Sequence, residues 1–358
     1  MVVSASERLV KRLELSATDA VVLHNPSNIF YITGGYTGEG IVLVSASQRV
    51  IVTDFRYTEQ AERQAPDFTV VMTDRDHPEN ARLGEWLRQN GITRLLYEDD
   101  VLTVRQQDRM LRAIGAVRLE SLNNAPEAMR EIKTGAEIEA IGKACAITSE
   151  AFNRILGSIR EGVTEKELAL ELDFLQRKLG AEGNSFDTIM AFGENGSLPH
   201  AIPGDRKLRR GDMITMDFGC KFGHYCSDMT RTVAFGQPSE TMLHVYNTVF
   251  TAQQMGVDAL APGKSCFEID RLTRDYIDSQ GYAGRFGHGL GHAVGIDIHE
   301  NPRLSMTCHD TVQVGHVLTV EPGVYLPGIG GVRIEDTCAV VEGGCKPLTS
   351  APKELIIL

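Results

Sequence analysis

A nine-residue pattern occurs twice in the chain, and both copies lead from a glycine to a carboxylate. The first copy is Gly211-Asp-Met-Ile-Thr-Met-Asp217-Phe-Gly219, and the second is Gly315-His-Val-Leu-Thr-Val-Glu321-Pro-Gly323. The copies continue to Asp228-Met-Thr230 and Glu335-Asp-Thr337, so each also ends in an acid, any residue and a threonine. Because the acids occupy matching places in strand-like runs, the pattern predicts two matched hairpins whose four acids share one cation site.

The expected faces of these strands favour a metal site over a solvated surface. Residues 213–217 read as a short apolar strand, and the two-residue period of a strand places Asp217 on the same face as Thr215. On the return run, Asp228 shares a face with Thr230. Buried carboxylates are costly unless a positive charge compensates them, and four of them require about two divalent ions, as in two-metal hydrolases. The alternative is four unrelated acids at solvent-facing turns, and the repetition argues against it.

Composition and charge restrict the class of protein. The chain has 358 residues, of which 42% are hydrophobic and 23% charged, as in an ordinary globular protein. The formal net charge of −12 argues against nucleic acid as a partner, because phosphate binding needs a basic surface. No run approaches the ~20 apolar residues of a membrane span. Residues 1–8 lack a basic segment followed by an apolar stretch, so we expect no signal peptide, no membrane partner and a cytoplasmic location.

The 7 cysteines do not form a recognisable metal or disulfide framework. They contain no Cys-x-x-Cys pair and no zinc-ribbon spacing, so we expect free thiols in a reducing compartment. Cys220 and Cys226 lie close in sequence to the first acidic copy, which leaves a catalytic thiol as an alternative.

The chain divides into two predicted domains, residues 1–127 and residues 128–358. Residues 1–127 read as an α/β unit, with strands expected at Ala20–His24, Gly40–Val44, Val50–Thr53, Phe68–Met72 and Arg94–Tyr97, and helices at Ser6–Leu15, Tyr57–Gln64 and Asn80–Gln89. Residues 128–358 are expected to hold helices from Thr134 to about Ile159 and at Thr164–Leu179, Glu240–Leu260 and Phe267–Gln280. Thr134 and Glu137 have the spacing of a capping box at the start of the first of these helices.

Four of the ten histidines lie in unusual contexts. His200 follows Leu-Pro before the first copy, and the segment Gly287-His288-Gly-Leu-Gly-His292-Ala-Val-Gly-Ile-Asp-Ile-His299 holds the other three. Neighbouring glycines permit close backbone approach and unusual dihedral angles. A carboxylate-rich site with one imidazole suits Mn, Co, Fe or Zn better than Cu. The remaining histidines are then free to donate hydrogen bonds to a developing oxyanion.

Together these motifs resemble the metallopeptidase family of methionine aminopeptidase, aminopeptidase P and prolidase, which has the pita-bread fold. The family's metal ligands match Asp217, Asp228, His292, Glu321 and Glu335, each in its expected local motif. The N-terminal part resembles the creatinase/prolidase amino-terminal domain at Asn28-Ile-Phe-Tyr-Ile-Thr-Gly-Gly35 and at Thr53-Asp-Phe-Arg-Tyr-Thr-Glu-Gln-Ala61. Because methionine aminopeptidase lacks that domain, the resemblance favours the proline-directed branch. It implies an α/β fold in which a small N-terminal domain precedes a pita-bread catalytic domain with pseudo-two-fold symmetry.

The resemblance also implies a role for each ligand. Asp217 would chelate one divalent ion, Asp228 and Glu335 would bridge, and His292 with Glu321 would hold the second ion. Two ions per subunit are expected, with Mn preferred and Co, Zn or Fe as alternatives. A bridging water would attack the carbonyl before proline. Glu321 would shuttle a proton to the imide nitrogen as a general acid–base.

The residues around the metals have implied roles in substrate handling. His200 and His299 would act in catalysis, together with His292 and Glu321, and would also grip the substrate. His288 and Arg333 would bind substrate nearby. Arg333 either clamps a substrate carboxylate with its bidentate fork or orients Glu335, and both readings stay open at the level of the sequence.

The favoured function is an Xaa-Pro dipeptidase, or prolidase, that cleaves the Xaa-Pro bond of short peptides and forms a homodimer. Glu335 follows Glu321 by only 14 positions, a short connection that resembles bacterial and archaeal prolidases more than aminopeptidase P. The alternative is an Xaa-Pro aminopeptidase acting on longer peptides. A creatinase-type amidinohydrolase and a non-catalytic peptide-binding pita-bread protein rank lower, because members of both groups lack part of the ligand set.

Overall fold

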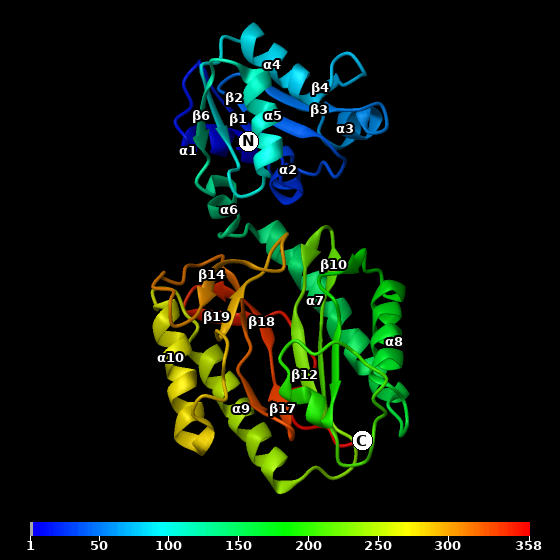
Figure 1. Cartoon of the computed structure of the whole chain (residues 1–358). Helices are drawn as coiled ribbons and strands as arrows, with labels where there is room; N and C mark the ends of the chain where they lie inside the picture. Colours follow the sequence, from blue (N-terminus) through cyan, green and yellow to red (C-terminus); the bar gives the residue numbers. More distant parts are fainter. Residues whose placement is uncertain (1–2) are drawn as a thin grey trace. The chain divides into compact units, whose positions relative to one another are not determined.

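A computed structural model describes residues 3–358 as two compact units, Met1–Arg130 and Glu131–Leu358 (Figure 1). The prediction that the chain has no signal peptide rests on residues 1–8. Two of these, Met1 and Val2, lie outside the described residues. Within residues 3–358, each helix is too short or too polar to cross a membrane.

The first unit is built on one six-stranded sheet, with strand order β4-β3-β2-β1-β5-β6. β1 pairs antiparallel with β2 and parallel with β5, so the sheet is mixed. Apolar side chains of β1, β2, β3 and β5 pack against α4 and α5 to form the core of this unit. Its elements are α1 Ala5–Arg12, β1 Asp19–Leu23, α2 Pro26–Thr33, β2 Ile41–Ser45, β3 Arg49–Thr53, α3 Thr58–Gln64, β4 Thr69–Met72, α4 Glu79–Gln89, β5 Arg94–Tyr97, α5 Val104–Ile114, β6 Arg118–Ser121 and α6 Ala125–Arg130.

The five predicted strands and three predicted helices of this unit are confirmed with end shifts of a few residues. The helix α2 was not predicted, although its signals are present in the sequence. Asn25 caps its start by accepting a hydrogen bond from the Ser27 amide at 2.9 Å, Pro26 occupies its first turn, and Gly34 ends it at φ 79°. Its apolar residues face the interior on several sides, so they show no single helical stripe.

The second unit contains two separate sheets that each carry a copy of the repeated pattern. The first copy lies in the sheet β12-β9-β8, and the second lies in the sheet β14-β13-β15-β18-β19. The helices are α7 Gly135–Ile155, α8 Glu165–Lys178, α9 Glu240–Ala259 and α10 Cys266–Ile277. The strands are β7 Gly183–Asn184, β8 Ile189–Phe192, β9 Met213–Phe218, β10 Cys220–Phe222, β11 Tyr225–Cys226, β12 Met229–Ala234, β13 Gly291–Ala293, β14 Glu300–Leu304, β15 Val317–Val320, β16 Gly323–Leu326, β17 Gly330–Arg333, β18 Asp336–Val341 and β19 Gly344–Pro347.

Each of these two sheets has its own pair of covering helices. Apolar residues of β8, β9 and β12 pack with α7 and α8, and those of β13, β15 and β18 pack with α9 and α10. Figure 1 shows the strands lying between the two helix pairs. The repeat extends to the backbone, because Gly211 and Gly315 both have φ 94° and both lie two positions before the first residue of their strand. The unit therefore has the pseudo-two-fold organisation that the repeated pattern predicts.

The ends of two predicted helices differ from the sequence interpretation. The helix expected to reach about Ile159 ends at Ile155 and continues as a 3-10 turn, Leu156–Ser158, which contains a helix-weakening glycine. The helix expected to reach Gln280 ends at Ile277. It is followed by a π-helical turn, Asp278–Tyr282, in which Gly281 has the non-helical φ of 91°. The predicted capping box is confirmed: the Thr134 amide donates to the Glu137 carboxylate at 2.8 Å, and Thr134 Oγ1 accepts from the Glu137 amide at 3.4 Å.

Candidate metal centre

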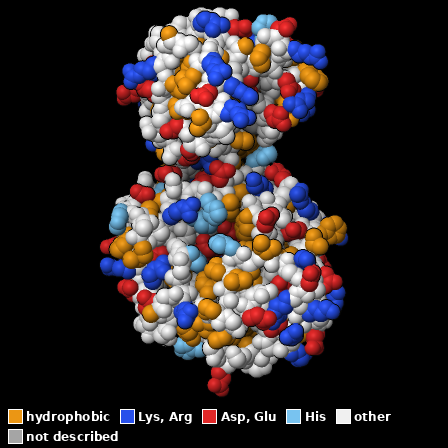
Figure 2. Space-filling view, viewed as in Figure 1, with side chains coloured by type: hydrophobic (Ala, Val, Ile, Leu, Met, Phe, Trp, Pro, Cys, Tyr) orange, Lys and Arg blue, Asp and Glu red, His pale blue; other side chains and the backbone are white. Residues whose placement is uncertain are grey.

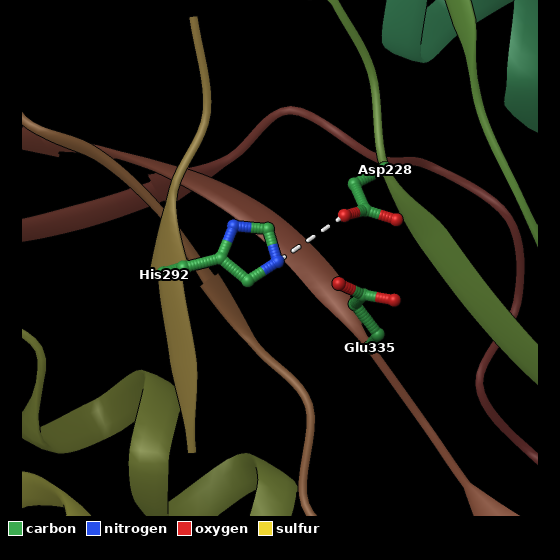
Figure 3. Close-up of side chains that lie close together, drawn as sticks. All are labelled: Asp228, His292 and Glu335. Carbon is green, nitrogen blue, oxygen red and sulfur yellow. Dashed lines mark ion pairs between the residues drawn. The ribbon is translucent and has the colours of Figure 1, made fainter. Parts of the chain in front are cut away.

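The five predicted ligands come together where the two repeat-bearing sheets meet. Asp217 lies on β9, Asp228 directly precedes β12, His292 lies on β13, Glu321 directly follows β15, and Glu335 directly precedes β18. One side-chain atom from each of Asp228, His292 and Glu335 lies within 4.8 Å of the others. Figure 3 shows these three side chains pointing into a common space, with the His292 ring facing the Asp228 carboxylate.

The threonines of the repeated pattern hold the acids in place, a role that sequence reasoning missed. Thr230 Oγ1 donates to Glu335 Oε2 at 2.8 Å, so the threonine of the first copy fixes the acid of the second. Thr337 Oγ1 donates to the Asp228 carbonyl oxygen at 2.8 Å, which is the reciprocal contact. The regular recurrence of acid, any residue and threonine was the signal in the sequence. In each copy, the threonine of the acid-x-Thr unit therefore contacts the acidic residue of the other copy, and the two copies form the site together.

His292 presents an unprotonated nitrogen to the carboxylates. Its Nδ1 lies 3.1 Å from the Ala293 carbonyl oxygen, which can only accept, so Nδ1 carries the proton. Burial lowers the pKa of His292 to about 3, and the ring is therefore neutral. The lone pair of Nε2 then faces Glu321 Oε1 at 3.4 Å and Asp228 Oδ2 at 3.5 Å. A lone pair opposed to carboxylate oxygens is repulsive unless a cation lies between them, and this donor set is that of a metal site.

The carboxylates show the same need for a cation. Burial, followed by the charges of Asp217 and Glu321, raises the pKa of Asp228 well above its ordinary value. Burial and Asp228 likewise raise the pKa of Glu335, and burial raises the pKa of Glu321 to about 8. Two buried oxygens, Asp217 Oδ1 and Glu335 Oε1, have no hydrogen-bond partner. Buried acceptors without donors are rare in folded proteins, so the residues present fit divalent cations.

Arg333 is engaged by the metal-centre residues themselves. Its Nη2 donates to Asp217 Oδ2 at 2.5 Å and its Nε donates to Thr230 Oγ1 at 3.0 Å. Its Nη1 donates to the Tyr325 hydroxyl at 2.9 Å, and that hydroxyl in turn donates to His288 Nε2 at 2.8 Å. Arg333 reaches Glu335 only through the hydroxyl of Thr230. Of the two readings left open by the sequence, these contacts favour the orientation of ligands over a clamp on the substrate.

His288 is held by the same network. Its Nδ1 donates to the Gly289 carbonyl oxygen at 2.8 Å, so its Nε2 is free to accept from Tyr325. Burial lowers the pKa of His288 to about 4, in agreement with a neutral ring. Tyr325 was not among the predicted residues, although it closes the sequence Glu-Pro-Gly-Val-Tyr that follows the second copy.

A cavity of about 800 Å³ opens beside the candidate metal centre. Among the residues that line it are all nine predicted site residues, His200, Asp217, Asp228, His288, His292, His299, Glu321, Arg333 and Glu335. His200 and His299 are exposed to the cavity, and the His299 ring centre lies 4.5 Å from that of His292. In Figure 2, histidine and acidic side chains are gathered on the visible face of this unit.

The cavity wall also contains Arg303, which was not predicted as a substrate-binding residue. Within residues 3–358, its guanidinium makes no hydrogen bond or ion pair with another side chain. Arg303 lies opposite His292 in the β13–β14 pairing, and its charge contributes to lowering the pKa values of His292 and His299, after burial. The sequence signal was weak, because a single arginine carries no spacing pattern.

The glycines beside the histidines act through close approach rather than through unusual dihedral angles. A Cβ atom on Gly291 would meet the Thr319 carbonyl oxygen at 2.0 Å, and one on Gly289 would meet the Leu304 carbonyl oxygen at 2.9 Å. Neither glycine has a positive φ, so that part of the sequence interpretation was wrong. The gap left by Gly291 lets β13 lie against β15 and brings His292 to Glu321.

Comparisons with known proteins agree with this geometry. The model of metallopeptidase family M24 matches residues 139–342, and that of the creatinase/prolidase N-terminal domain matches residues 6–132. An Xaa-Pro dipeptidase of Pyrococcus furiosus is 34% identical over 351 residues, covering 98% of this chain and 99% of that protein.

Solved structures share the whole architecture. The Xaa-Pro dipeptidase from Bacillus anthracis superposes with a TM-score of 0.95 at 40% identity, and the X-Pro aminopeptidase from Thermotoga maritima MSB8 with a TM-score of 0.91 at 34% identity. Each comparison covers 99% of both chains. The chain belongs to metallopeptidase family M24, with a creatinase/prolidase N-terminal domain before a pita-bread catalytic domain.

Proposed function

We propose that the protein is a metal-dependent exopeptidase that hydrolyses Xaa-Pro dipeptides. The observation that carries this proposal is the convergence of the five ligands beside one cavity, with a histidine lone pair and two unpartnered carboxylate oxygens facing the same space. The full-length similarity to Xaa-Pro dipeptidases of Pyrococcus furiosus and Bacillus anthracis supports the substrate class.

Two divalent ions would be held by Asp217, Asp228, His292, Glu321 and Glu335. When bound, such ions supply an activated water at neutral pH and polarise the substrate carbonyl. Manganese is our proposed metal, with Co, Zn and Fe as alternatives, because the donors are carboxylates and a single imidazole. Metal analysis of protein purified without added metal tests this identity.

Side chains beside the metal ligands would stabilise the oxyanion, and Glu321 would transfer the proton. His200 and His299 line the cavity beside the ligands, and their ring N–H groups are suited to donating to the oxyanion that forms at the scissile carbonyl. Glu321 is suited to proton transfer, because its carboxylate lines the cavity and its Oε1 lies 3.4 Å from His292 Nε2, beside the position proposed for the activated water. Its proton would pass to the proline nitrogen as the peptide bond breaks.

Arg303 is our candidate for recognising the free carboxylate of a dipeptide. It lines the cavity, and among the described side chains it has no hydrogen-bonding partner, whereas Arg333 already donates to Asp217, Thr230 and Tyr325. Arg303 can therefore form a bidentate pair with a substrate carboxylate. A longer peptide would place an amide at that point and would lose the charge-assisted contact.

The test compares an Xaa-Pro dipeptide with the corresponding Xaa-Pro-Xaa tripeptide on manganese-reconstituted protein. We expect faster hydrolysis of the dipeptide, and Arg303→Met should raise its KM while leaving the tripeptide nearly unaffected. The loss of one hydrogen bond to a charged group corresponds to about 1.5–3 kcal/mol, or roughly a 10- to 150-fold change in kcat/KM. A faster tripeptide reaction would contradict the proposal.

An Xaa-Pro aminopeptidase is the second candidate, and a specific observation favours it. The X-Pro aminopeptidase of Thermotoga maritima MSB8 matches this chain over 99% of both lengths, so the overall two-domain layout does not separate the two activities. Under this alternative, both substrates would be cleaved and the Arg303→Met change would affect them equally.

We also propose an oligomeric state, a cellular location and domain boundaries for the protein. A homodimer rests on the family resemblance and is tested by light scattering. A cytoplasmic location suits the thiols of Cys145, Cys220, Cys226, Cys266, Cys308, Cys338 and Cys345, all of which are free. We also propose residues 1–127 and 128–358 as the functional domains, supported by the division of the contacts after Arg130.

A further inference from the structure

A buried cluster of charges lies directly behind Glu335, on the side away from the cavity. At its centre is Arg231, which is 2% exposed. All five of its N–H groups are used: Nε donates to Pro352 O at 3.0 Å, Nη1 to Thr230 O at 3.0 Å and to Glu335 O, and Nη2 to Asp336 Oδ1 and Ala351 O, both at 2.8 Å. Arg231 therefore joins β12, the start of β18 and the C-terminal segment of the chain.

Asp336 is the second member of this cluster, and its carboxylate is fully hydrogen-bonded. Oδ1 accepts from Arg231 and from Thr349 Oγ1, the latter at 2.7 Å. Oδ2 accepts from Lys353 Nζ at 2.8 Å and from Gln253 Nε2 at 3.0 Å. Two cations thus surround one carboxylate. Thr349 and Lys353 both belong to the C-terminal segment, whose last residues run beside the end of β12 (Figure 1).

This cluster fixes the backbone on both sides of Glu335. The Glu335 amide donates to the Thr230 carbonyl oxygen at 3.1 Å, and its own carbonyl oxygen accepts from Arg231. The next residue, Asp336, is held by the contacts of its side chain. With the backbone fixed and Oε2 accepting from Thr230 Oγ1, Oε1 is the carboxylate oxygen of Glu335 that has no hydrogen-bond partner, and Glu335 is a member of the ligand cluster.

We propose that the C-terminal segment Thr349–Lys353 is a positioning element for the candidate metal ligand Glu335, acting through Asp336 and Arg231. The inference rests on the proposed metal-dependent function. Lys353 itself neither lines the cavity nor contacts a ligand. Its Nζ donates to Asp336 Oδ2 at 2.8 Å and to Gln253 Oε1 at 2.9 Å, and Gln253 also donates to Asp336, so an effect of Lys353 on metal binding passes through these two residues. A purely structural role for the cluster would change stability but would leave the affinity of the folded protein for metal unaltered.

The experiment measures the dissociation constant of Mn²⁺ for metal-stripped full-length protein by isothermal titration calorimetry, below the unfolding temperature of every variant. Lys353→Met should bind Mn²⁺ about 10- to 100-fold more weakly, the usual effect of losing a residue that supports a metal ligand. Lys353→Arg keeps the charge beside Asp336 and should restore the affinity to within a few-fold of the wild type. Lys143→Met removes an exposed lysine from an ion pair with Glu139 and should leave the affinity unchanged.

Thr349→Val provides a second variant in case Lys353→Met does not fold. It removes one of the four donors to Asp336 with little change of shape, and a loss of affinity of about 10-fold is expected. Wild-type affinity in a folded Lys353→Met protein, or in Thr349→Val where Lys353→Met does not fold, would overturn the positioning role while leaving the proposed function intact. Wild-type protein that binds no Mn²⁺ would instead overturn the proposed function and this inference with it.

Discussion

The ion pair between Lys133 and Glu300 gives the sharpest prediction about stability. Lys133 Nζ lies 2.9 Å from Glu300 Oε2, and the two side chains are only 1% and 6% exposed. The Lys133→Met substitution would remove the cation that lies 2.9 Å from the buried Glu300 carboxylate. Breaking a buried pair from one side costs about 3–5 kcal/mol. For a unit of the size of Glu131–Leu358, each kcal/mol shifts Tm by about 2–4 °C, so we expect Tm to fall by roughly 6–20 °C.

The pair also fixes the segment that holds His299. The Lys133 amide donates to the Gly315 carbonyl oxygen at 2.8 Å, which anchors the lysine to the start of the second repeat. Glu300 directly follows His299, and its Oε1 accepts from the Asp297 amide at 3.2 Å. Lys133→Met should therefore also lower kcat while the metal content stays the same, because the ligands are on other segments.

Thermal unfolding followed by calorimetry measures the loss, and a double variant isolates the pair. Glu300→Gln keeps an acceptor for the Asp297 amide and removes the charge, so adding it to Lys133→Met should recover stability. A coupling energy of about 0.5–3 kcal/mol is expected from the cycle. The matched control is Lys166→Met, which breaks an ion pair with Asp205 whose side chains are 55% and 86% exposed. That variant should stay within about 0.5 kcal/mol of the wild type.

A Lys133→Met protein that unfolds within 2 °C of the wild type would refute this reasoning, because the carboxylate would then be solvated or compensated by another group. A double variant less stable than Lys133→Met alone would refute it in a different way. In that case Glu300 would stabilise the unit mainly through contacts that do not depend on the lysine charge.

Three further predictions test the site and its surroundings. Glu335→Gln removes a proposed metal ligand, so the metal content by elemental mass spectrometry should fall from about two ions per chain to about one or fewer; an unchanged content would show that Glu335 is not a ligand. Tyr325→Phe removes the partner of Arg333 and His288, and thermal unfolding should show a loss of about 1–3 kcal/mol. His316 is 2% exposed and burial lowers its pKa from 6.5 to about 4, so the unfolded chain binds the proton first as pH falls. The free energy of unfolding, measured by urea unfolding at each pH, should be highest above pH ~6.5 and should fall by about 3 kcal/mol as the pH falls towards ~4. In His316→Gln this dependence on pH should be weaker.

The sequence predicted those parts of the fold that depend on local periodicity. The strand β9 is an example: Ile214, Met216 and Phe218 pack in the core with α7 and α8, while Thr215 and Asp217 lie on the opposite face and contact β17. By contrast, β6 has a polar composition and lies at the edge of its sheet, so it has no apolar alternation to reveal it. Its position is set by pairing with β5, a tertiary contact that a single sequence does not encode locally.

The ligands of the candidate site could be predicted from the sequence, but the hydrogen bonds that hold them in place could not. Repetition identified the acids, because equivalent places in two copies carry equivalent chemistry. The contacts of Arg333 could not be found in this way, since they depend on Tyr325 and Thr230 approaching from different strands. The same holds for Arg231, four of whose five partners lie more than 100 positions away in sequence. Long-range polar contacts of this kind follow from the packing of the two sheets.

The departures from the repeat explain why the metal centre is asymmetric. In the first sheet, Ala191 of β8 lies opposite Thr215. In the second sheet, the matching neighbour of Thr319 is His292, whose amide donates to the Thr319 hydroxyl at 3.0 Å. An alanine in one half and a histidine in the other give the two halves of the candidate metal centre different donors, with carboxylates alone on the Asp217 side and an imidazole on the Glu321 side. Because β13 also brings Arg303 and His299 to the cavity through its pairing and ring contacts, the asymmetric half is the one that faces the proposed substrate groups. A symmetric pair of hairpins would offer the same donors on both sides. The single histidine, His292, is what makes the two sides of the candidate site different.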